Sequence, residues 1–396
     1  MTKTLKTDVI IIGAGAAGLM CAIEAGKRGR SVLVLDHANK VGKKILMSGG
    51  GRCNFTNYHI GFDNYLSNNP HFCKSALSRY TQWDFIELVN KHNIPFHEKT
   101  LGQLFCDNKS RDIVNMLVAE CDEAGVSIKL NTTIHSIDAL KPHHYKLHTT
   151  LGDVHCESLV IASGGLSIPT MGASPFGYQI AEQFGLKVLP TRAGLVPFTL
   201  HSHDKEKLDC LSGIGVASIT SNDRASFSEN MLFTHRGLSG PAMLQISSYW
   251  QPGEAINVNL MPSIDLYDYL QAQQQQQPQQ QLKTSLSQLL PKRVVNVLLD
   301  DAYASRTLAN LSDNDMQHIS HEFQGWQVKP NGTEGYRTAE VTLGGVDCDQ
   351  LSSKTFEVNN QPGLYFLGEV LDVTGWLGGY NFQWAWSSGW AGGQVV

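Results

Sequence analysis

The feature that most constrains the fold is a glycine-rich turn near the start of the chain. Residues 8–12 form a β-branched run that is typical of a strand buried on both faces. Residues 13–18 follow directly and match the pattern G-x-G-x-x-G, and a helix-prone segment over 19–25 leads to a second apolar run over 31–36. Together these segments predict a β-α-β unit of a doubly wound parallel sheet.

The spacing within this unit predicts a dinucleotide site. Gly13 permits the tight turn, Gly15 lets the backbone approach a pyrophosphate at the helix start near Ala16, and Gly18 lets the helix pack on the strand. Asp36 ends the second strand 18 residues after Gly18, where it can accept hydrogen bonds from an adenosine ribose. An acid at this position favours FAD or NAD over NADP.

Two distant glycine turns favour FAD. Residues 159–165 and 363–372 each read as a strand that runs into a turn, and the second turn contains Gly-Glu. The carboxyl ends of parallel strands meet at one edge of a sheet, where a ligand as long as FAD can contact all of them. There is one G-x-G-x-x-G pattern in the chain, so no separate domain for NAD(P)H is expected. Either NAD(P)H visits the substrate face as a transient reductant, or the substrate itself is the reductant.

Composition limits the partners. The 396 residues include 31 basic and 36 acidic side chains, a net charge of −5 that argues against nucleic acid and leaves a small-molecule substrate as the expected partner. Eight scattered cysteines show no metal-like spacing, so no metal is expected. The uncharged stretches 159–181 and 373–396 are broken by glycine and polar residues, so we expect no membrane span. The start of the chain shows no secretion signal, which indicates a cytoplasmic protein.

Four longer motifs carry a family resemblance. Residues 43–57, 234–241, 341–346 and 368–381 resemble the signatures of the BaiN/YhiN-type FAD-binding flavoproteins, the aminoacetone oxidase family, and are most similar to its enterobacterial members. The resemblance implies an α/β fold with a split Rossmann-like FAD-binding domain, an inserted β-rich domain and a small helical subdomain. The expected segments are 1–190 and 341–396 for the FAD-binding domain, 191–262 and 325–340 for the β-rich domain, and 263–324 for the helical subdomain.

The resemblance also implies the residues of the site beyond the first β-α-β unit. Those along the flavin would be Lys44, Gly51, Arg52, Cys53 and Asn54, and those that close the site would be Ser163, Gly164, Gly368, Glu369, Asp372, Gly379, Tyr380 and Asn381. The expected activity is that of an FAD-dependent oxidoreductase acting on a small organic substrate by hydride transfer at flavin N5, either as a reductase or as an oxidase. The alternatives are a tRNA-modifying flavoprotein and a non-catalytic flavin or redox sensor.

Catalytic residues are not assigned by the sequence. Cys53 is either a redox partner or acid, or a residue that packs on the flavin. His235 either holds an anion or moves a proton, or it is a hydrogen-bonded histidine at a domain seam. Trp386 and Trp390 are expected in the core. The glutamine-rich residues 271–281 are expected to form an exposed connection.

Overall fold

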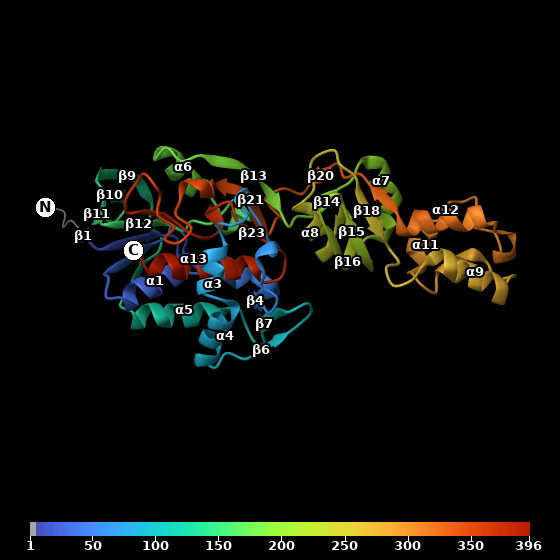
Figure 1. The fold of residues 1–396 in the computed structure, drawn as a ribbon, viewed down its shortest axis with the longest axis horizontal. Coiled ribbons are helices and arrows are strands. Elements are labelled where there is room, and N and C mark those ends of the chain that lie inside the picture. The colour runs from blue at the N-terminus through green and yellow to red at the C-terminus, as the bar shows by residue number, and fades with distance from the viewer. Residues whose placement is uncertain (1–4) are drawn as a thin grey trace. The chain divides into compact units, whose positions relative to one another are not determined.

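The computed structural model describes residues 5–396, and Figure 1 shows their course. They divide into two units. Unit 1 contains the chain up to Arg192 and from Val341 onwards, and unit 2 contains Ala193–Glu340. The finer division into five segments stays a prediction.

A five-stranded parallel sheet forms the centre of unit 1. Its strand order is β22 (Leu364–Phe366), β12 (Ser158–Ile161), β2 (Val9–Ile12), β3 (Val32–Leu35) and β8 (Ser127–Lys129). All residues of β2, β3 and β12 are buried, as the continuous apolar runs predicted. Ile12 pairs with both Leu35 and Ile161, so the carboxyl ends of the three strands lie at one edge. The predicted Rossmann-like fold class is confirmed.

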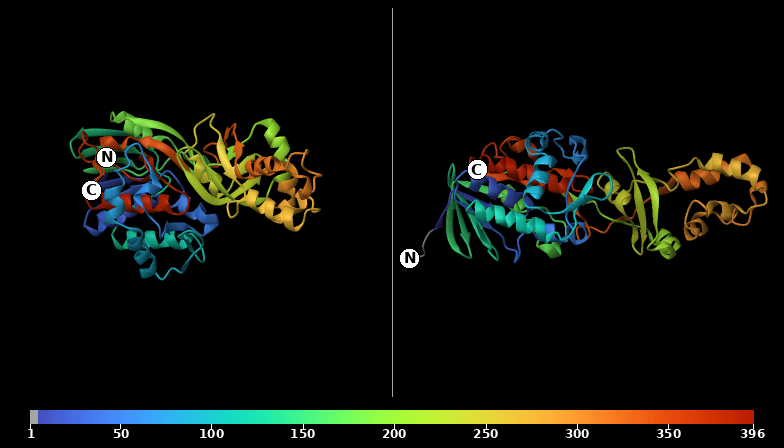
Figure 2. Two further views of the ribbon diagram at one scale, coloured as in Figure 1. Left: turned by 45° about the vertical axis from the view of Figure 1, so that its right-hand side comes forward. Right: turned by 90° about the horizontal axis from the view of Figure 1, so that it is seen from below.

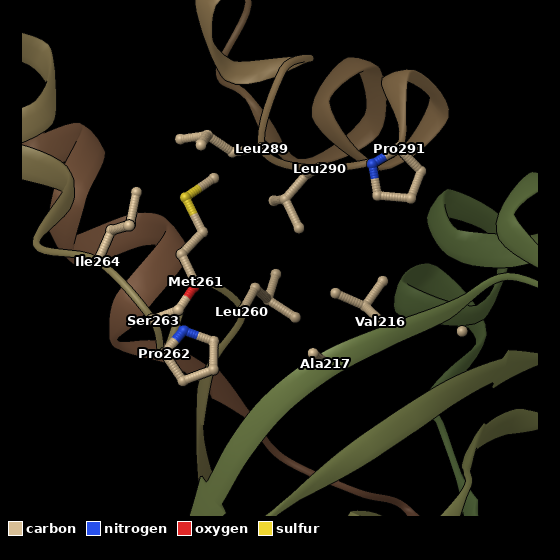
Figure 3. Close-up of a pocket in the computed structure, with 11 residues that line it drawn as sticks. Val216, Ala217, Leu260, Met261, Pro262, Ser263, Ile264, Leu289, Leu290 and Pro291 are labelled. Atoms are coloured by element: carbon tan, nitrogen blue, oxygen red, sulfur yellow. The ribbon is translucent and has the colours of Figure 1, made fainter.

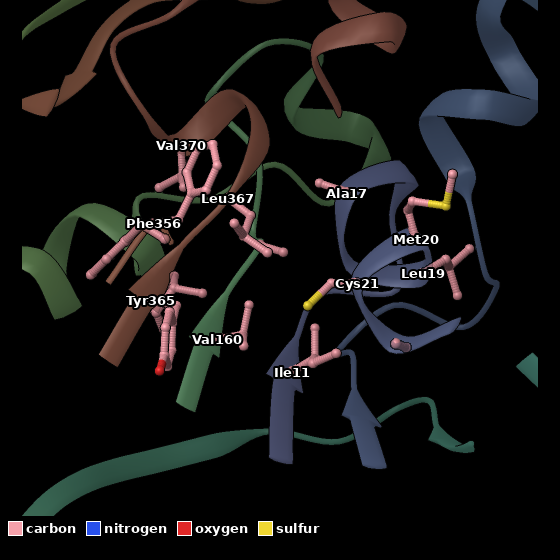
Figure 4. Packing of buried hydrophobic residues seen from close by; sticks show 14 of the residues in the cluster. Ile11, Ala17, Leu19, Met20, Cys21, Val160, Phe356, Tyr365, Leu367 and Val370 are labelled. Carbon is pink, nitrogen blue, oxygen red and sulfur yellow. The ribbon is translucent and has the colours of Figure 1, made fainter. Parts of the chain in front are cut away.

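One helix packs on this sheet, and two more helices pack against that helix. The helix α1 (Ala16–Lys27) packs on β2 and β3, and both α5 (Arg111–Glu123) and α13 (Tyr380–Gly393) pack against α1. A Cβ atom at Gly389 of α13 would overlap the carbonyl oxygen of Ala17, so glycine is what allows the close approach of these two helices. Figure 4 shows side chains of α1 and of the strands in this core. Trp386 is fully buried, whereas Trp390 is partly buried and packs against the core.

Smaller elements surround the central sheet of unit 1. A four-stranded sheet has the order β1 (Leu5–Lys6), β11 (Gly152–Cys156), β10 (His144–Thr149) and β9 (Ile134–Lys141), and a three-stranded sheet has the order β4 (Asn54–Asn57), β7 (Gln103–Cys106) and β6 (Phe96–Glu98). Two strand pairs are β13 (Val188–Gly194) with β21 (Val341–Val346), and β23 (Thr374–Gly375) with β5 (Tyr65–Leu66). The remaining helices are α2 (Lys43–Met47), α3 (Lys74–Arg79), α4 (Gln82–Lys91) and α6 (Phe176–Gln183).

Unit 2 is built on a seven-stranded antiparallel sheet. The strand order is β19 (Trp326–Val328), β18 (Ile256–Asn259), β15 (Gly215–Ser221), β16 (Ser226–Thr234), β17 (Gly237–Ser239), β14 (Phe198–Thr199) and β20 (Gly332–Thr333). Its helices are α7 (Ser202–Leu208), α8 (Pro241–Ser247), α9 (Leu266–Gln276), α10 (Leu282–Leu286), α11 (Lys292–Leu298) and α12 (Asp313–Gln324). Figure 2 shows the sheet and these helices from two further directions.

The glutamine-rich residues 271–281 are mostly exposed, as expected, but only part of them is a connection. The first six, 271–276, form the second half of α9. Asp265 caps this helix by accepting a hydrogen bond from the backbone N–H of Asp268 at 3.1 Å. Gln274 also donates from its side chain to the carbonyl oxygens of Leu308 and Leu311 at 2.7 and 2.9 Å. Glutamine is a good helix former, and tertiary hydrogen bonds hold this tract against its neighbours.

Candidate functional site

The glycine-rich turn connects β2 to α1 at the carboxyl edge of the parallel sheet. Gly13 has φ +114°, and a Cβ atom there would overlap the carbonyl oxygen of Ala162. A Cβ atom at Gly18 would overlap the carbonyl oxygen of Gly13. Both glycines are therefore required by the packing of the protein itself, whether or not a ligand is bound.

Gly15 differs from these two glycines. It is the N-cap residue of α1 with ordinary extended backbone angles, and no side chain caps the helix start. A Cβ atom at Gly15 would meet no protein atom within 4 Å. The first N–H groups of a helix carry partial positive charge and bind phosphate. This open, uncapped helix start fits the pyrophosphate of a dinucleotide.

Asp36 holds the same turn from the end of β3. Its two carboxylate oxygens accept hydrogen bonds from the backbone N–H groups of Ala14 and Ala38, each at 2.7 Å. The carboxylate is thereby fixed beside the glycine turn. Contact of Asp36 with an adenosine ribose stays a prediction. The structure adds a second role, because the carboxylate also holds the glycine turn in place.

A charged cluster lies between α2, the turn after β12 and the segment after β22. Lys44 donates from Nζ to Glu369 Oε2 and to Ser167 Oγ, both at 2.8 Å. Glu369 Oε1 accepts from the backbone N–H of Thr342 at 3.1 Å and from Ser167 Oγ at 3.3 Å. Thr342 Oγ1 in turn accepts from the backbone N–H of Leu166 at 2.8 Å.

This cluster joins two predicted site residues that are 325 positions apart, Lys44 and Glu369. Sequence reasoning missed Ser167 and Thr342, although Thr342 lies in the quoted motif 341–346. A hydroxyl next to a glycine turn is too common a pattern to have identified them. One ammonium and one carboxylate stabilise each other here, and Lys44 keeps a third of its side chain exposed at the edge of the site.

The glycine-rich loop 48–54 presents bare backbone. Gly49, Gly50 and Gly51 have φ values of +58°, +65° and +87°, which only glycine adopts easily. A Cβ atom at Gly50 or Gly51 would meet nothing within 4 Å, as would one at Gly15. The loop therefore leaves room for a flat ligand against its backbone. Arg52 is exposed beside it.

Cys53 ends this loop but is fully buried, with φ +48°. Burial raises the pKa of its thiol far above the ordinary value. A thiol that is neither accessible nor ionised does not act as a nucleophile. Packing is therefore the role that the structure favours for Cys53.

The side chains of three predicted site residues form hydrogen bonds with backbone groups of the protein itself. Asn54, in the amide orientation that satisfies its neighbours, accepts from the backbone N–H of Gly379 at 3.2 Å. Asp372 accepts from the backbone N–H of Asn68 at 2.7 Å, and burial raises the pKa of its carboxyl group. Asn381 both accepts from and donates to the backbone of Gly375 at 2.8 Å. These side chains position the loops around the site.

The other predicted residues lie on turns that approach α1 and α13 closely. Gly368 has φ +74°, and a Cβ atom there would come within 2.8 Å of the Ala17 side chain. Gly379 is the N-cap residue of α13, where no side-chain cap is present. The hydroxyl of Tyr380 donates to the carbonyl oxygen of His59 at 3.4 Å. A Cβ atom at Gly164 would lie 3.7 Å from the Glu369 carboxylate and would meet no other protein atom within 4 Å. The Ser163 hydroxyl lies close to Gly177.

In unit 2, His235 is exposed in the turn between β16 and β17. The next residue, Arg236, forms an ion pair with Glu334 at 2.9 Å. Figure 3 shows a pocket of this unit, which β15 lines together with residues 260–264 and 289–291. None of its lining side chains is ionisable, so no base is present in the lining to activate the hydroxyl of Ser263.

Comparison with known proteins decides the family. The model of the HI0933-like protein Rossmann domain matches residues 7–395. The chain belongs to this family. Its members are FAD-binding Rossmann proteins, and the chain is a flavin-dependent enzyme.

Three relatives are informative. A protein of Escherichia coli named ribosomal RNA dihydrouridine synthase is 59% identical over 98% of both chains. A protein of Haemophilus influenzae with the same name is 52% identical over 97% of both chains. A 3-dehydro-bile acid delta(4,6)-reductase of Clostridium scindens is 25% identical over 98% of both chains. None of these names is that of an aminoacetone oxidase, so the family is established without that label.

The expectation of no nucleic-acid partner is wrong, because the two relatives of highest identity reported above are named for a reaction on ribosomal RNA. Net charge averages over the whole chain, whereas RNA binding depends on where the cations lie. Unit 2 carries the entire excess of acid, with 10 basic and 15 acidic side chains, while unit 1 has 21 of each.

Residues 5–396 contain neither a candidate membrane span nor a candidate metal site. No helix there combines the length and the apolar character needed to cross a bilayer. Within the same residues, no three histidine, cysteine or acidic side chains are grouped so as to bind a metal ion.

Proposed function

We propose that this enzyme reduces a uridine base of ribosomal RNA to dihydrouridine. The observation that carries the proposal is the 59% identity, over 98% of both chains, to the E. coli protein of that name. Identity at this level over the full length of both units supports a common substrate as well as a common cofactor. A cytoplasmic location is part of the proposal, because ribosomal RNA is a cytoplasmic substrate.

The reaction adds two hydrogens across the C5=C6 bond of uracil. A hydride is added at C6 and a proton at C5, and FAD supplies the hydride when bound. The electrons come from NADPH or NADH. We propose that this nucleotide binds only transiently, because the one G-x-G-x-x-G pattern of the chain is assigned to FAD. One reduced nicotinamide and one proton are consumed for each dihydrouridine formed.

The geometry of unit 1 supports specific roles in binding FAD. The open start of α1 at Gly15 would receive the pyrophosphate, and Asp36 would fix the adenosine end. The bare backbone at Gly50 and Gly51 would lie against the flavin. Lys44, held by Glu369, would supply a positive charge at the edge of the site. The uncapped start of α13 would face developing negative charge on a bound ligand.

The more distant relative supports the reaction class independently of the substrate. Both dihydrouridine formation and the reaction named for the C. scindens protein reduce carbon–carbon double bonds. The cofactor chemistry is therefore proposed to be shared across the family. Substrate choice is proposed to depend on surfaces outside the FAD site.

The test uses ribosomal RNA from an E. coli strain that lacks the 59% identical relative. The purified protein with FAD and NADPH is expected to add 2 mass units to a uridine, detected by mass spectrometry of nuclease fragments. A parallel reaction without NADPH is the control. Bleaching of the flavin by NADPH without any change in the RNA would refute the proposed substrate.

Replacement of Cys53 by alanine is expected to leave dihydrouridine formation within about threefold of wild type. The thiol is fully buried and its pKa is raised, so it neither reaches a base nor exists as thiolate. The rate is measured with the same RNA at saturating FAD, and flavin content is measured alongside it. A loss of a hundredfold or more with normal flavin content would show that Cys53 takes part in the chemistry.

A further inference from the structure

Unpaired cations gather around the glycine-rich loop of unit 1. Five basic residues lie near this loop, and none of the five forms an ion pair with any residue between 5 and 396. By contrast, Lys27, Lys44 and Lys91 all form ion pairs. Four of the five are exposed and one is half-buried. We call them the basic rim, which consists of Lys43, Arg52, Lys99, Lys109 and Arg111.

Hydrogen bonds from Ser110 fix two of these residues to the loop. The Ser110 backbone N–H donates to the carbonyl oxygen of Gly51, and its hydroxyl donates to that of Leu46, both at 2.8 Å. Lys109 and Arg111 flank Ser110, so both stand next to the loop at the start of α5.

Lys99 and Lys43 lie beside other parts of the loop. The Lys99 ammonium is 5.3 Å from the centre of the Phe105 ring, and a Cβ atom at Gly49 would lie 2.8 Å from the same ring. Lys99 is thus separated from the loop by one aromatic side chain. Lys43 lies on α2, one turn before Leu46, to which Ser110 is bonded. The five basic residues therefore lie within or next to one short segment, residues 43–54.

The acidic residues among these cations are already engaged. Asp107 pairs with His97 Nδ1 at 2.6 Å. Glu98 accepts from the backbone N–H of Gly102 at 3.0 Å, and Asp112 accepts from that of Lys109 at 3.4 Å. These three carboxylates keep their charge but form no ion pair with the basic rim, whose five cations outnumber them, although unit 1 as a whole has equal numbers of acids and bases.

An exposed aromatic side chain adjoins the basic rim. Trp83 is 58% exposed, the largest exposed fraction of any tryptophan among residues 5–396. It stacks on Tyr58 with ring centres 5.5 Å apart, and the Tyr58 N–H donates to the carbonyl oxygen of Gly102. Gly102 lies in the β6–β7 turn that also carries Lys99. A tryptophan held rigid on one face and open on the other is suited to stacking an unpaired base.

We propose that the basic rim and Trp83 form the RNA-docking surface of this enzyme. The cations bind backbone phosphates, and Trp83 stacks on an unpaired base next to the target nucleotide. This inference rests on the proposed function, since it identifies where the RNA substrate binds. It also accounts for RNA binding by a chain with a net charge of −5, because the binding cations are local to the loop that the FAD site shares.

The test removes three rim charges that have no proposed role toward FAD. The triple variant Lys99→Gln, Lys109→Gln, Arg111→Gln and the wild type, both loaded with FAD, are titrated with labelled ribosomal RNA between 50 and 200 mM salt. Each lost phosphate contact reduces the slope of log affinity against log salt by about 0.7 for single strands, so the slope is expected to fall by about 2. Affinity at 100 mM salt is expected to fall by roughly ten- to a hundredfold.

The matched control is Lys129→Gln, Lys141→Gln, Lys354→Gln, which removes the same charge from exposed, unpaired sites elsewhere in unit 1. It is expected to bind RNA as the wild type does. Equal affinity losses in the two triple variants would overturn the proposal and indicate a general charge effect. Wild type that neither binds nor modifies RNA would refute the proposed function itself, whereas RNA modification that is unchanged in the rim variant would refute only the docking surface.

Trp83 is tested separately. Trp83→Leu is expected to weaken RNA binding by about tenfold with an unchanged salt slope, because base stacking is not electrostatic. Trp83→Phe retains a stacking face and is expected to recover most of the affinity. Because Trp83 is exposed, neither change is expected to lower the melting temperature. Equal RNA affinity in both variants and the wild type would overturn the role of Trp83.

Discussion

The variant Gly15→Ala is expected to fold normally and to lose most of its affinity for FAD. A Cβ atom at this position meets no protein atom within 4 Å, and the backbone angles are accessible to alanine. The added methyl group instead occupies the space beside the first N–H groups of α1, where we propose that the pyrophosphate binds. A hydrogen bond to a charged group contributes about 1.5–3 kcal/mol, so affinity is expected to fall by roughly ten- to 150-fold.

The matched control is Gly18→Ala, three positions further along the same turn. Its Cβ atom would overlap the carbonyl oxygen of Gly13, so this variant is expected to lose stability with or without FAD. FAD titration by fluorescence and melting of the FAD-free protein measure both effects. Wild-type FAD affinity in Gly15→Ala would contradict the proposed position of the pyrophosphate.

Replacement of Glu120 by glutamine is expected to cost about 3–5 kcal/mol of stability. The Glu120 carboxylate is fully buried in α5 and lies 2.6 Å from Lys91 Nζ, 2.7 Å from His92 Nε2 and 3.0 Å from Lys27 Nζ. Burial by itself would raise the pKa of Glu120, but these three basic partners outweigh it and lower the pKa to about 2. The variant leaves the three basic groups without their shared anion.

The same pKa shift predicts a pH dependence. A group whose pKa is lower in the folded state stabilises the protein above its unfolded pKa, and this contribution is lost as the pH falls through the folded pKa. Wild type is therefore expected to lose about 3 kcal/mol from this group between pH 5 and pH 2, and Glu120→Gln is expected to lack that component. Urea unfolding at several pH values measures it.

Glu123→Gln, an exposed change on the same helix, is the control for this prediction. It is expected to change stability by less than about 0.5 kcal/mol and to keep the pH dependence of the wild type. Identical pH profiles for wild type and Glu120→Gln would show that the buried cluster contributes no pH-dependent stability.

Local spacing explains what could be predicted from the sequence. The parallel strands, the turn at residues 13–18 and the helix after it follow from β-branched runs and glycines at fixed intervals, since these act within a few residues. Such patterns do not depend on what the chain contacts elsewhere.

Contacts between distant residues explain what could not be predicted. The partnership of Lys44 with Glu369 joins two ends of the chain, and the burial of Cys53 comes from packing around a short loop. The prediction from net charge is wrong for a related reason, because a sum over all residues does not record where the charges lie in the folded chain.

The sequence by itself determined the parallel sheet, the dinucleotide turn and the preference for FAD, because these depend on local backbone conformation and on side-chain size at fixed spacing. Only the tertiary structure decided which glycines serve the fold and which leave room for a ligand. Gly13 and Gly18 are pressed against backbone, whereas Gly15 is open, although all three belong to one motif. Whether a Cβ atom would collide depends on neighbours brought close by folding, and the linear spacing of glycines does not contain that information.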